Sequence, residues 1–244
     1  MRIFFYLTIA TLFGSCAGDS VKKSRADILL DKGIEAAGGW QNWMDLDTIQ
    51  FYKMTKLYLE DGSLEDSTYQ LHTYYMYPEM NGKYSWKEEQ TEYEIRYHNG
   101  SINKYSDGKE INISDEEKEK YRLSFLGAQF TMSMPFKLKD PGVIIGLAGI
   151  NTINGKEVEV LNASYNSNLY SHTDSHDWWY YFDRESGEQI GYKVHHSPTF
   201  ARVINVETIK LNGIRFPKYR KSYRVDKDDN ELYLRAEFWY SFIE

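Results

Sequence analysis

Alternation of apolar and polar side chains at a period of two is the feature that most constrains how this sequence can fold. In an extended segment, residues separated by two positions lie on the same face. Residues 48–59 follow this rule and place on one face Ile49, Phe51, Lys53, Thr55, Leu57 and Leu59. The chain also contains 21 Tyr, 12 Phe and 6 Trp, residue types that favour strands with one apolar side and one wet side. The pattern predicts a protein built mainly from β-strands.

Turn dipeptides separate the alternating segments. Asparagine or aspartate followed by glycine suits a tight hairpin, because both residues tolerate positive φ. Such pairs occur at Asn81-Gly82, Asn99-Gly100, Asp107-Gly108, Asn154-Gly155 and Asn212-Gly213, with Ser186-Gly187 as a further turn. Short strands joined by tight turns predict an antiparallel meander of roughly ten or eleven strands.

Two segments have helical features instead. Ser24 can cap a helix over 24–37, which Gly38-Gly39 then ends. Ser114 and Glu117 form a capping box at the start of a second helix, which must end before Pro135. Residues 136–150 are apolar and contain glycine, and they are expected to form a buried loop or a short helix. The predicted fold class is therefore α+β, with one large antiparallel sheet and two principal helices.

The N-terminus resembles a bacterial lipoprotein signal. Arg2 precedes eleven apolar residues, 3–13, and the small residues Gly14 and Ser15 lead to Cys16. A transmembrane helix needs about 20 apolar residues, so this run is too short to be one. Cys16 is the only cysteine and cannot form an intramolecular disulfide. We expect cleavage after residue 15, a lipid on Cys16, a tether over 16–24 and one domain over 25–244.

The charge of the chain argues against nucleic-acid binding. The formal net charge is −7, whereas binding to phosphate backbones needs clustered positive charge. The most basic segment is 218–224, KYRKSYR, in which cations alternate with aromatic residues. We interpret it as the solvated face of a strand.

One polar cluster offers metal ligands. In an extended chain His172, Asp174 and His176 project to the same side, and two imidazoles with a carboxylate can bind a divalent metal. The alternative is a polar loop before the strand that begins at Trp178, and this alternative is favoured. His195 and His196 could add ligands, but the sequence does not bring them together. No local motif of a hydrolase, phosphate loop or dinucleotide site is present, and no cofactor is expected.

Several segments together resemble a known family. They are the opening 34–40 (IEAAGGW), 135–142 (PFKLKDPG), Tyr180-Tyr181-Phe182-Asp183 with Ser186-Gly187, and 212–217 (NGIRFP). In this combination the chain resembles a family of uncharacterised lipoproteins of Bacteroidota, which look like relatives of the outer-membrane lipoprotein carrier and sorting proteins. The resemblance implies a half-barrel in which a curved antiparallel sheet wraps around two or three helices and encloses an apolar cavity. It supplies no catalytic residues.

These observations favour a non-enzymatic protein of the cell envelope. It is expected to be anchored by its lipid in the outer membrane, to face the periplasm, and to bind or shuttle an acyl chain or another apolar ligand. One alternative is a metal-dependent envelope hydrolase that uses His172, Asp174 and His176. Another is a structural lipoprotein that binds another envelope protein through an aromatic edge. The sequence identifies neither the ligand-binding residues nor a protein partner.

Overall fold

A computed structural model describes residues 23–76, 81–165, 177–196 and 198–243 of the chain; at residue 196 it describes the backbone only. None of the helices in these ranges combines the length and the apolar character needed to cross a membrane. The elements are α1 (Arg25–Ala36), α2 (Trp40–Met44), β1 (Thr48–Tyr58), β2 (Leu64–Tyr75), β3 (Asn81–Glu88), β4 (Thr91–His98), β5 (Ser101–Ser106), β6 (Lys109–Ile111), α3 (Asp115–Met132), a 3-10 helix η1 (Phe136–Lys139), β7 (Val143–Ile153), β8 (Lys156–Tyr165), β9 (Trp178–Asp183), β10 (Gln189–His196), β11 (Thr199–Leu211), β12 (Ile214–Val225) and β13 (Glu231–Phe242).

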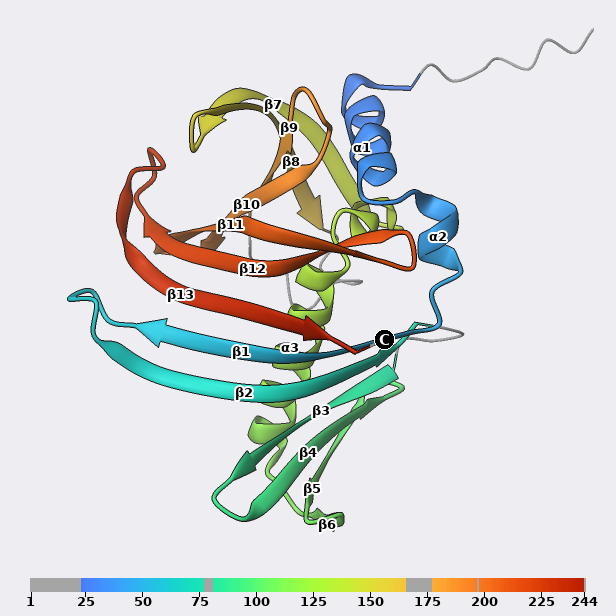
Figure 1. Ribbon diagram of the computed structural model, residues 1–244, viewed down its shortest axis with the longest axis vertical. Helices are drawn as coiled ribbons and strands as arrows, with labels where there is room; N and C mark the ends of the chain where they lie inside the picture. The colour runs from blue at the N-terminus through green and yellow to red at the C-terminus, as the bar shows by residue number, and fades with distance from the viewer. Residues whose placement is uncertain (1–22, 77–80, 166–176, 197, 244) are drawn as a thin grey trace, which may run out of the picture.

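All thirteen described strands form one open antiparallel sheet (Figure 1). Their order is β6-β5-β4-β3-β2-β1-β13-β12-β11-β10-β9-β8-β7. Every neighbour is therefore also a neighbour in sequence except at one place, where β1 pairs with β13. There Phe51 lies opposite Phe242 and Lys53 opposite Tyr240. The β1–β13 ladder joins an N-terminal meander to a C-terminal one.

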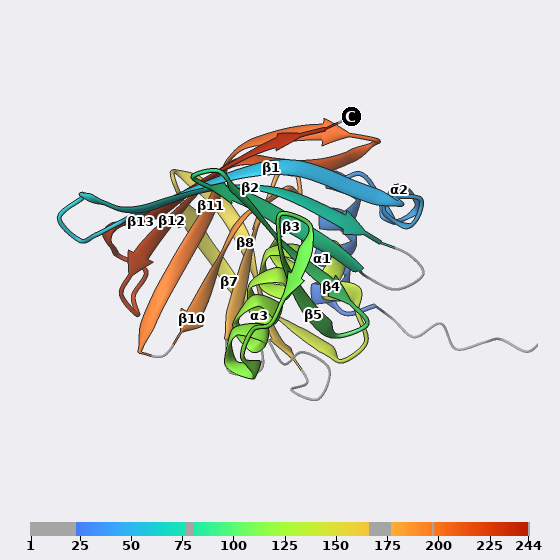
Figure 2. The same ribbon diagram turned by 90° about the horizontal axis from the view of Figure 1, so that it is seen from below.

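Helix α3 lies in the hollow of the curved sheet (Figure 2). Phe125 is fully buried, stacks on Tyr97 of β4 at 4.7 Å between ring centroids, and meets Tyr74 of β2 edge-on at 5.2 Å. Five residues later, Phe130 meets Trp178 of β9 edge-on at 5.5 Å. A single helix therefore packs against both meanders and covers the apolar face that the alternating strands turn inward.

The two predicted principal helices are present with the caps that the sequence indicated. Ser114 accepts a hydrogen bond from the backbone N–H of Glu117, whose carboxylate accepts from the N–H of Ser114 in return. Ser24 and Asp27 make the same reciprocal pair at the start of α1. At Gly33 an added Cβ would lie 2.3 Å from the ring of Phe182, so glycine lets α1 approach β9 closely. The large antiparallel sheet with helices in its hollow confirms the predicted α+β fold.

Three details of the prediction are wrong. The strand number was underestimated, and the segment expected to be a buried loop or short helix contains η1 followed by β7, a strand with mostly exposed residues at the edge of the sheet. Exposed edge positions need no apolar alternation, so the pattern could not reveal this strand. Asn81-Gly82 is not a hairpin turn, because both residues lie in β3. The other asparagine–glycine and aspartate–glycine pairs do have positive φ at both residues.

Gly82 owes its identity to close packing, and this can be tested. A Cβ there would lie 2.4 Å from the carbonyl oxygen of Thr73 and 2.9 Å from the ring of Phe125. We expect Gly82→Ala to lower the free energy of unfolding by about 1–3 kcal/mol, as overpacking does. Chemical denaturation monitored by tryptophan fluorescence measures the change. Gly146→Ala in β7 is the matched control, because nothing lies within 4 Å of its added Cβ. Equal stability of the two variants would contradict the packing role of Gly82.

A candidate ligand cavity between helix α3 and the sheet

A cavity of about 290 Å³ lies between α3 and the inner face of the sheet. Its helix side consists mainly of small residues and its sheet side of long polar and aromatic ones. The lining residues are Leu123, Ser124, Gly127, Ala128 and Thr131 of α3, with Lys53, Gln70, His72, Tyr192, Arg220, Phe238 and Tyr240 of the strands. Nothing lies within 4 Å of a Cβ added at Gly127, so the space in front of this residue is open.

The strand register brings the polar residues of the cavity together. Lys53 on β1 lies opposite Gln70 on β2 and Tyr240 on β13, and Arg220 on β12 lies opposite Phe238. Directly opposite residues of antiparallel strands point to the same face of the sheet. The β1–β13 ladder therefore places two cations on the concave side, on the two strands that flank β13.

Arg220 is buried, with 4% of its surface exposed, and its guanidinium group fixes the end of α3. Its Nη2 donates to the carbonyl oxygen of Thr131 at 2.9 Å, and its Nε donates to Oδ1 of Asn205 at 2.8 Å. The last carbonyl groups of a helix lack partners within the helix, and the C-terminal end of its dipole attracts cations. Arg220 thus has a structural role in addition to its place in the cavity.

Lys53 has fewer partners than Arg220. Its Nζ lies 5.3 Å from the centre of the Phe238 ring. Burial, together with the positive charge of Arg220, lowers the pKa of Lys53 to about 8. No Asp or Glu lines the cavity, and among the described residues neither Lys53 nor Arg220 belongs to an ion pair. The cavity wall therefore carries positive charge, and no carboxylate in the wall balances it.

His72 is neutral in this environment. It is buried and stacks between Phe51 and Tyr84, with both ring centroids 5.3 Å away. Its burial, and secondarily the charge of Lys53, holds the pKa of His72 well below the usual value. Its Nε2 is 3.2 Å from Oε1 of Gln70, an acceptor, and its Nδ1 is 3.0 Å from the hydroxyl of Tyr74. Both ring nitrogens therefore have a polar partner, which a neutral imidazole, with one donor and one acceptor nitrogen, can satisfy.

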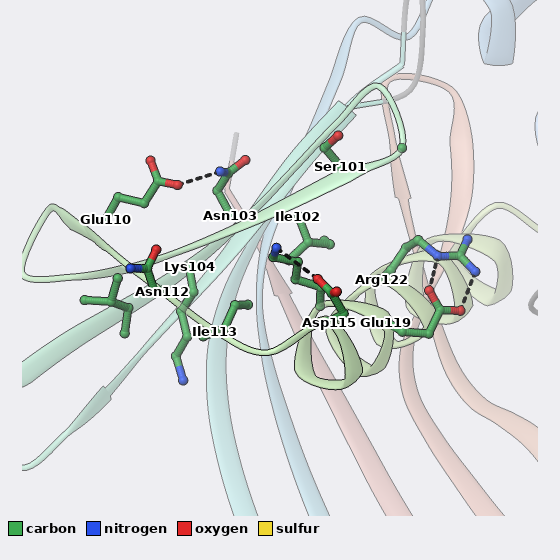
Figure 3. A pocket seen from close by; sticks show the side chains of 13 residues that line it. Ser101, Ile102, Asn103, Lys104, Glu110, Asn112, Ile113, Asp115, Glu119 and Arg122 are labelled. Carbon is green, nitrogen blue, oxygen red and sulfur yellow. Dashed lines mark hydrogen bonds and ion pairs between the residues drawn. The ribbon is translucent and has the colours of Figure 1, made fainter.

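A second hollow, of about 420 Å³, lies where β5 and β6 meet the start of α3 (Figure 3). Its lining has three cations and three carboxylates, and each of these groups except Lys104 has a hydrogen-bond or ion-pair partner within the hollow. Arg122 binds Glu119 through two hydrogen bonds of 2.7 Å, Lys118 lies 3.3 Å from Asp115, and Asn103 donates to Glu110 at 2.7 Å. The balanced charges make this hollow a solvated groove, so the cavity beside Lys53 is the better candidate for a ligand site.

The residues singled out from the sequence lie elsewhere. Cys16 and the cluster His172, Asp174 and His176 fall outside the described residues, so the lipidation and the metal hypothesis stay predictions. His195 lies in β10, stacks on Phe200 at 4.3 Å, and has its Nδ1 3.7 Å from a carboxylate oxygen of Asp177. Within the part of the chain that the structure describes, no three or more His, Cys, Asp or Glu side chains gather in a way that could hold a metal.

The sequence pattern did not predict Lys53 and Arg220 as residues of a ligand site, although the pattern around Lys53 contains a signal. Lys53 interrupts an inward row of apolar residues, and a cation in such a row is the mark of a buried polar site. Arg220 belongs to the segment 218–224, which was interpreted as a solvated face. That interpretation is wrong for Arg220, because alternate residues of β12 point to opposite faces and Arg220 points to the helix side.

The fold is similar to those of several proteins of known structure. No curated protein matches the sequence. The solved structure of a DUF1329 family protein from Desulfovibrio piger matches with a TM-score of 0.52 and 8% identity, covering 91% of this chain and 92% of that chain. A LolA superfamily protein from Nitrosomonas europaea matches with a TM-score of 0.52 and 11% identity, covering 88% and 91%. The likeness to the LolA superfamily confirms the fold that the sequence resemblance implied.

The sequence itself matches a family model over almost its whole length. The match covers residues 2–237, from before α1 to the middle of β13, and the model is described as a family of unknown function, DUF6503. The chain belongs to the DUF6503 family.

Proposed function

We propose that this protein is a lipid-anchored, non-enzymatic protein of the cell envelope that binds an acyl chain or another apolar ligand in the cavity beside α3. The observation that carries the proposal is the open space in front of Gly127, within a core that is elsewhere filled by large aromatic side chains. Ligand-binding sites are usually formed before the ligand binds, and an open cavity between a helix and a sheet is such a site.

The lining suits a ligand with an apolar part. Leu123 and Ala128 on the helix and Phe238 on the sheet present carbon surfaces, and the ring faces of Tyr192 and Tyr240 add to them. Ligand pockets usually enclose about 300–1,000 Å³, and this cavity, at about 290 Å³, is just below that range. It fits part of one chain or a compact ligand better than a whole diacyl lipid.

The comparisons and the N-terminus support the cellular setting of the proposal. The fold is that of the LolA superfamily protein, and lipid attachment at Cys16 would hold the domain within reach of a membrane. We place the anchor in the outer membrane with the domain facing the periplasm. A cavity with apolar and polar walls, held close to lipid, suits a protein that handles single amphiphilic chains.

Filling the cavity should abolish binding. Gly127→Leu puts a side chain into the open space and also improves helix propensity at an interior position of α3. We expect native mass spectrometry of the purified protein to detect a bound ligand in the wild type and none in Gly127→Leu. Extraction with organic solvent and mass spectrometry then identify the ligand.

Gly127→Ala serves as the control, because its methyl group occupies little of the space and should raise the free energy of unfolding by about 0.5–1 kcal/mol. The ligand should stay bound in this variant. A wild-type protein without ligand that also takes up no alkyl compound would contradict the proposal, as would retention of the ligand in Gly127→Leu.

The anchor is tested separately at Cys16. Removing its thiol with Cys16→Ser removes the site of lipid attachment, so we expect the protein to move from the membrane fraction to the soluble fraction. Metabolic labelling with a fatty-acid analogue, followed by fractionation, measures both effects. Substitution of Ser15 by Ala, which keeps a small residue before the cysteine, should leave the distribution unchanged. An unlabelled wild-type protein would show that Cys16 is not lipidated.

A further inference from the structure

We propose that the cavity binds an anionic amphiphile and holds its carboxylate or phosphate group between Lys53 and Arg220. The inference rests on the proposed function and adds to it the chemical class of the ligand. The apolar part of the ligand would lie along Leu123 and Phe238, and the anionic group would face the two cations.

The charge balance of the cavity supports an anion. Lys53 and Arg220 line the same cavity, no Asp or Glu does, and neither cation has an ion-pair partner among the described residues. Arg220 is buried and Lys53 is half-buried, and holding two like charges together away from bulk water is unfavourable unless an opposite charge compensates them. An anionic ligand would supply that compensation, and its removal would leave the two cations repelling each other.

The available hydrogen-bond donors also fit an oxyanion. Arg220 donates from Nε to Asn205 and from Nη2 to Thr131, and its guanidinium group also lies against Tyr240, which lines the same cavity. The ammonium group of Lys53 has three hydrogens, and its contact is the ring of Phe238. Hydrogen bonds from charged donors to carboxylate or phosphate oxygens are among the strongest in proteins.

A purely structural explanation accounts for only one of the two cations. Arg220 would be needed at the end of α3 even in a protein that binds nothing, because it satisfies the carbonyl group of Thr131. Lys53 satisfies no backbone or side-chain acceptor among the described residues, although it lies in a row with Ile49 and Phe51, both buried. A methionine of similar length would cover Phe238 without the cost of a charge. The presence of lysine is explained by a ligand.

Matched amphiphiles test the headgroup. The protein is the full-length chain carrying Cys16→Ser, and the probes are decanoate, decyl phosphate and decanol, which share one alkyl chain. Isothermal titration calorimetry at pH 7 should give affinities for the two anions at least about tenfold higher than for decanol. Inorganic phosphate and acetate, titrated alone, separate a lipid headgroup from a free anion.

Variants on one strand assign the effect to a residue. Lys53→Met should weaken binding of decanoate and decyl phosphate about tenfold or more and leave decanol unchanged. Lys56→Met is the matched control, because Lys56 lies on β1 but faces the opposite side, over the ring of Trp239. It should alter none of the three affinities. Chemical denaturation of both variants shows that the fold is intact.

The pH dependence provides a second measurement. The titratable groups facing Lys53 are Arg220, His72, Tyr192 and Tyr240. His72 is neutral because its pKa is lowered, and burial raises the pKa of both tyrosines, that of Tyr192 to about 12. Between pH 7 and 10, Lys53 alone among them loses its charge, with a pKa of about 8. Affinity for decanoate should therefore fall as the pH rises through and above 8, and in Lys53→Met it should stay level.

The outcomes separate the headgroup from the proposed function. Equal affinities for decanoate and decanol, or equal behaviour of Lys53→Met and Lys56→Met, would overturn the anion subsite. Binding of the alkyl chain itself would still support the cavity as a ligand site. Inorganic phosphate binding as tightly as decyl phosphate would show a site for a free anion and overturn the amphiphile. A protein that binds none of the probes would overturn both proposals.

Discussion

Packing of helix α3 against the concave face of the sheet is the interaction on which the rest of the structure depends. The thirteen described strands form one sheet whose inner face is largely apolar, and this face needs a cover because exposed apolar area is costly in water. With 18 residues, α3 spans about 27 Å, enough to contact both meanders. Phe125 contacts the N-terminal meander and Phe130 the C-terminal one. Without this helix the β1–β13 ladder would be left as the main link between the two halves.

The cavity results from how α3 distributes side-chain size. Phe125 and Phe130 fill the core, whereas Ser124, Gly127 and Ala128 face the cavity and leave room in front of Lys53. Large residues on part of the helix surface provide stability, and small ones on another part provide space. The residues of α3 that fill the core are thus different from those that line the cavity. A substitution at Gly127 can therefore change the cavity without disturbing the core.

The features that could be predicted from the sequence are mostly those that depend on residues close together in the chain. The caps at Ser24 and Ser114, and the turns with asparagine or aspartate before glycine, depend on neighbours within a few residues, so they were predictable. Gly82 was misassigned because its role comes from contact with Thr73 and Phe125, which sequence spacing does not show. The cavity needs the β1–β13 pairing and the position of α3 together. Lys53 was placed correctly on the inward face, but its unbalanced charge became evident only when the opposite strands were known.

The pairing of the first strand with the last has a consequence for the order of folding during synthesis. Tyr58 and Glu237, which hydrogen-bond across the β1–β13 junction at 2.6 Å, are 179 residues apart in sequence. Each meander can form from local hairpins as it emerges, but closing the long loop between them waits for β13. The cavity has walls on both sides of that junction, so a growing chain holds no finished site. A protein truncated before β13 would keep most of its strands but would lack the Phe238 and Tyr240 part of the cavity wall.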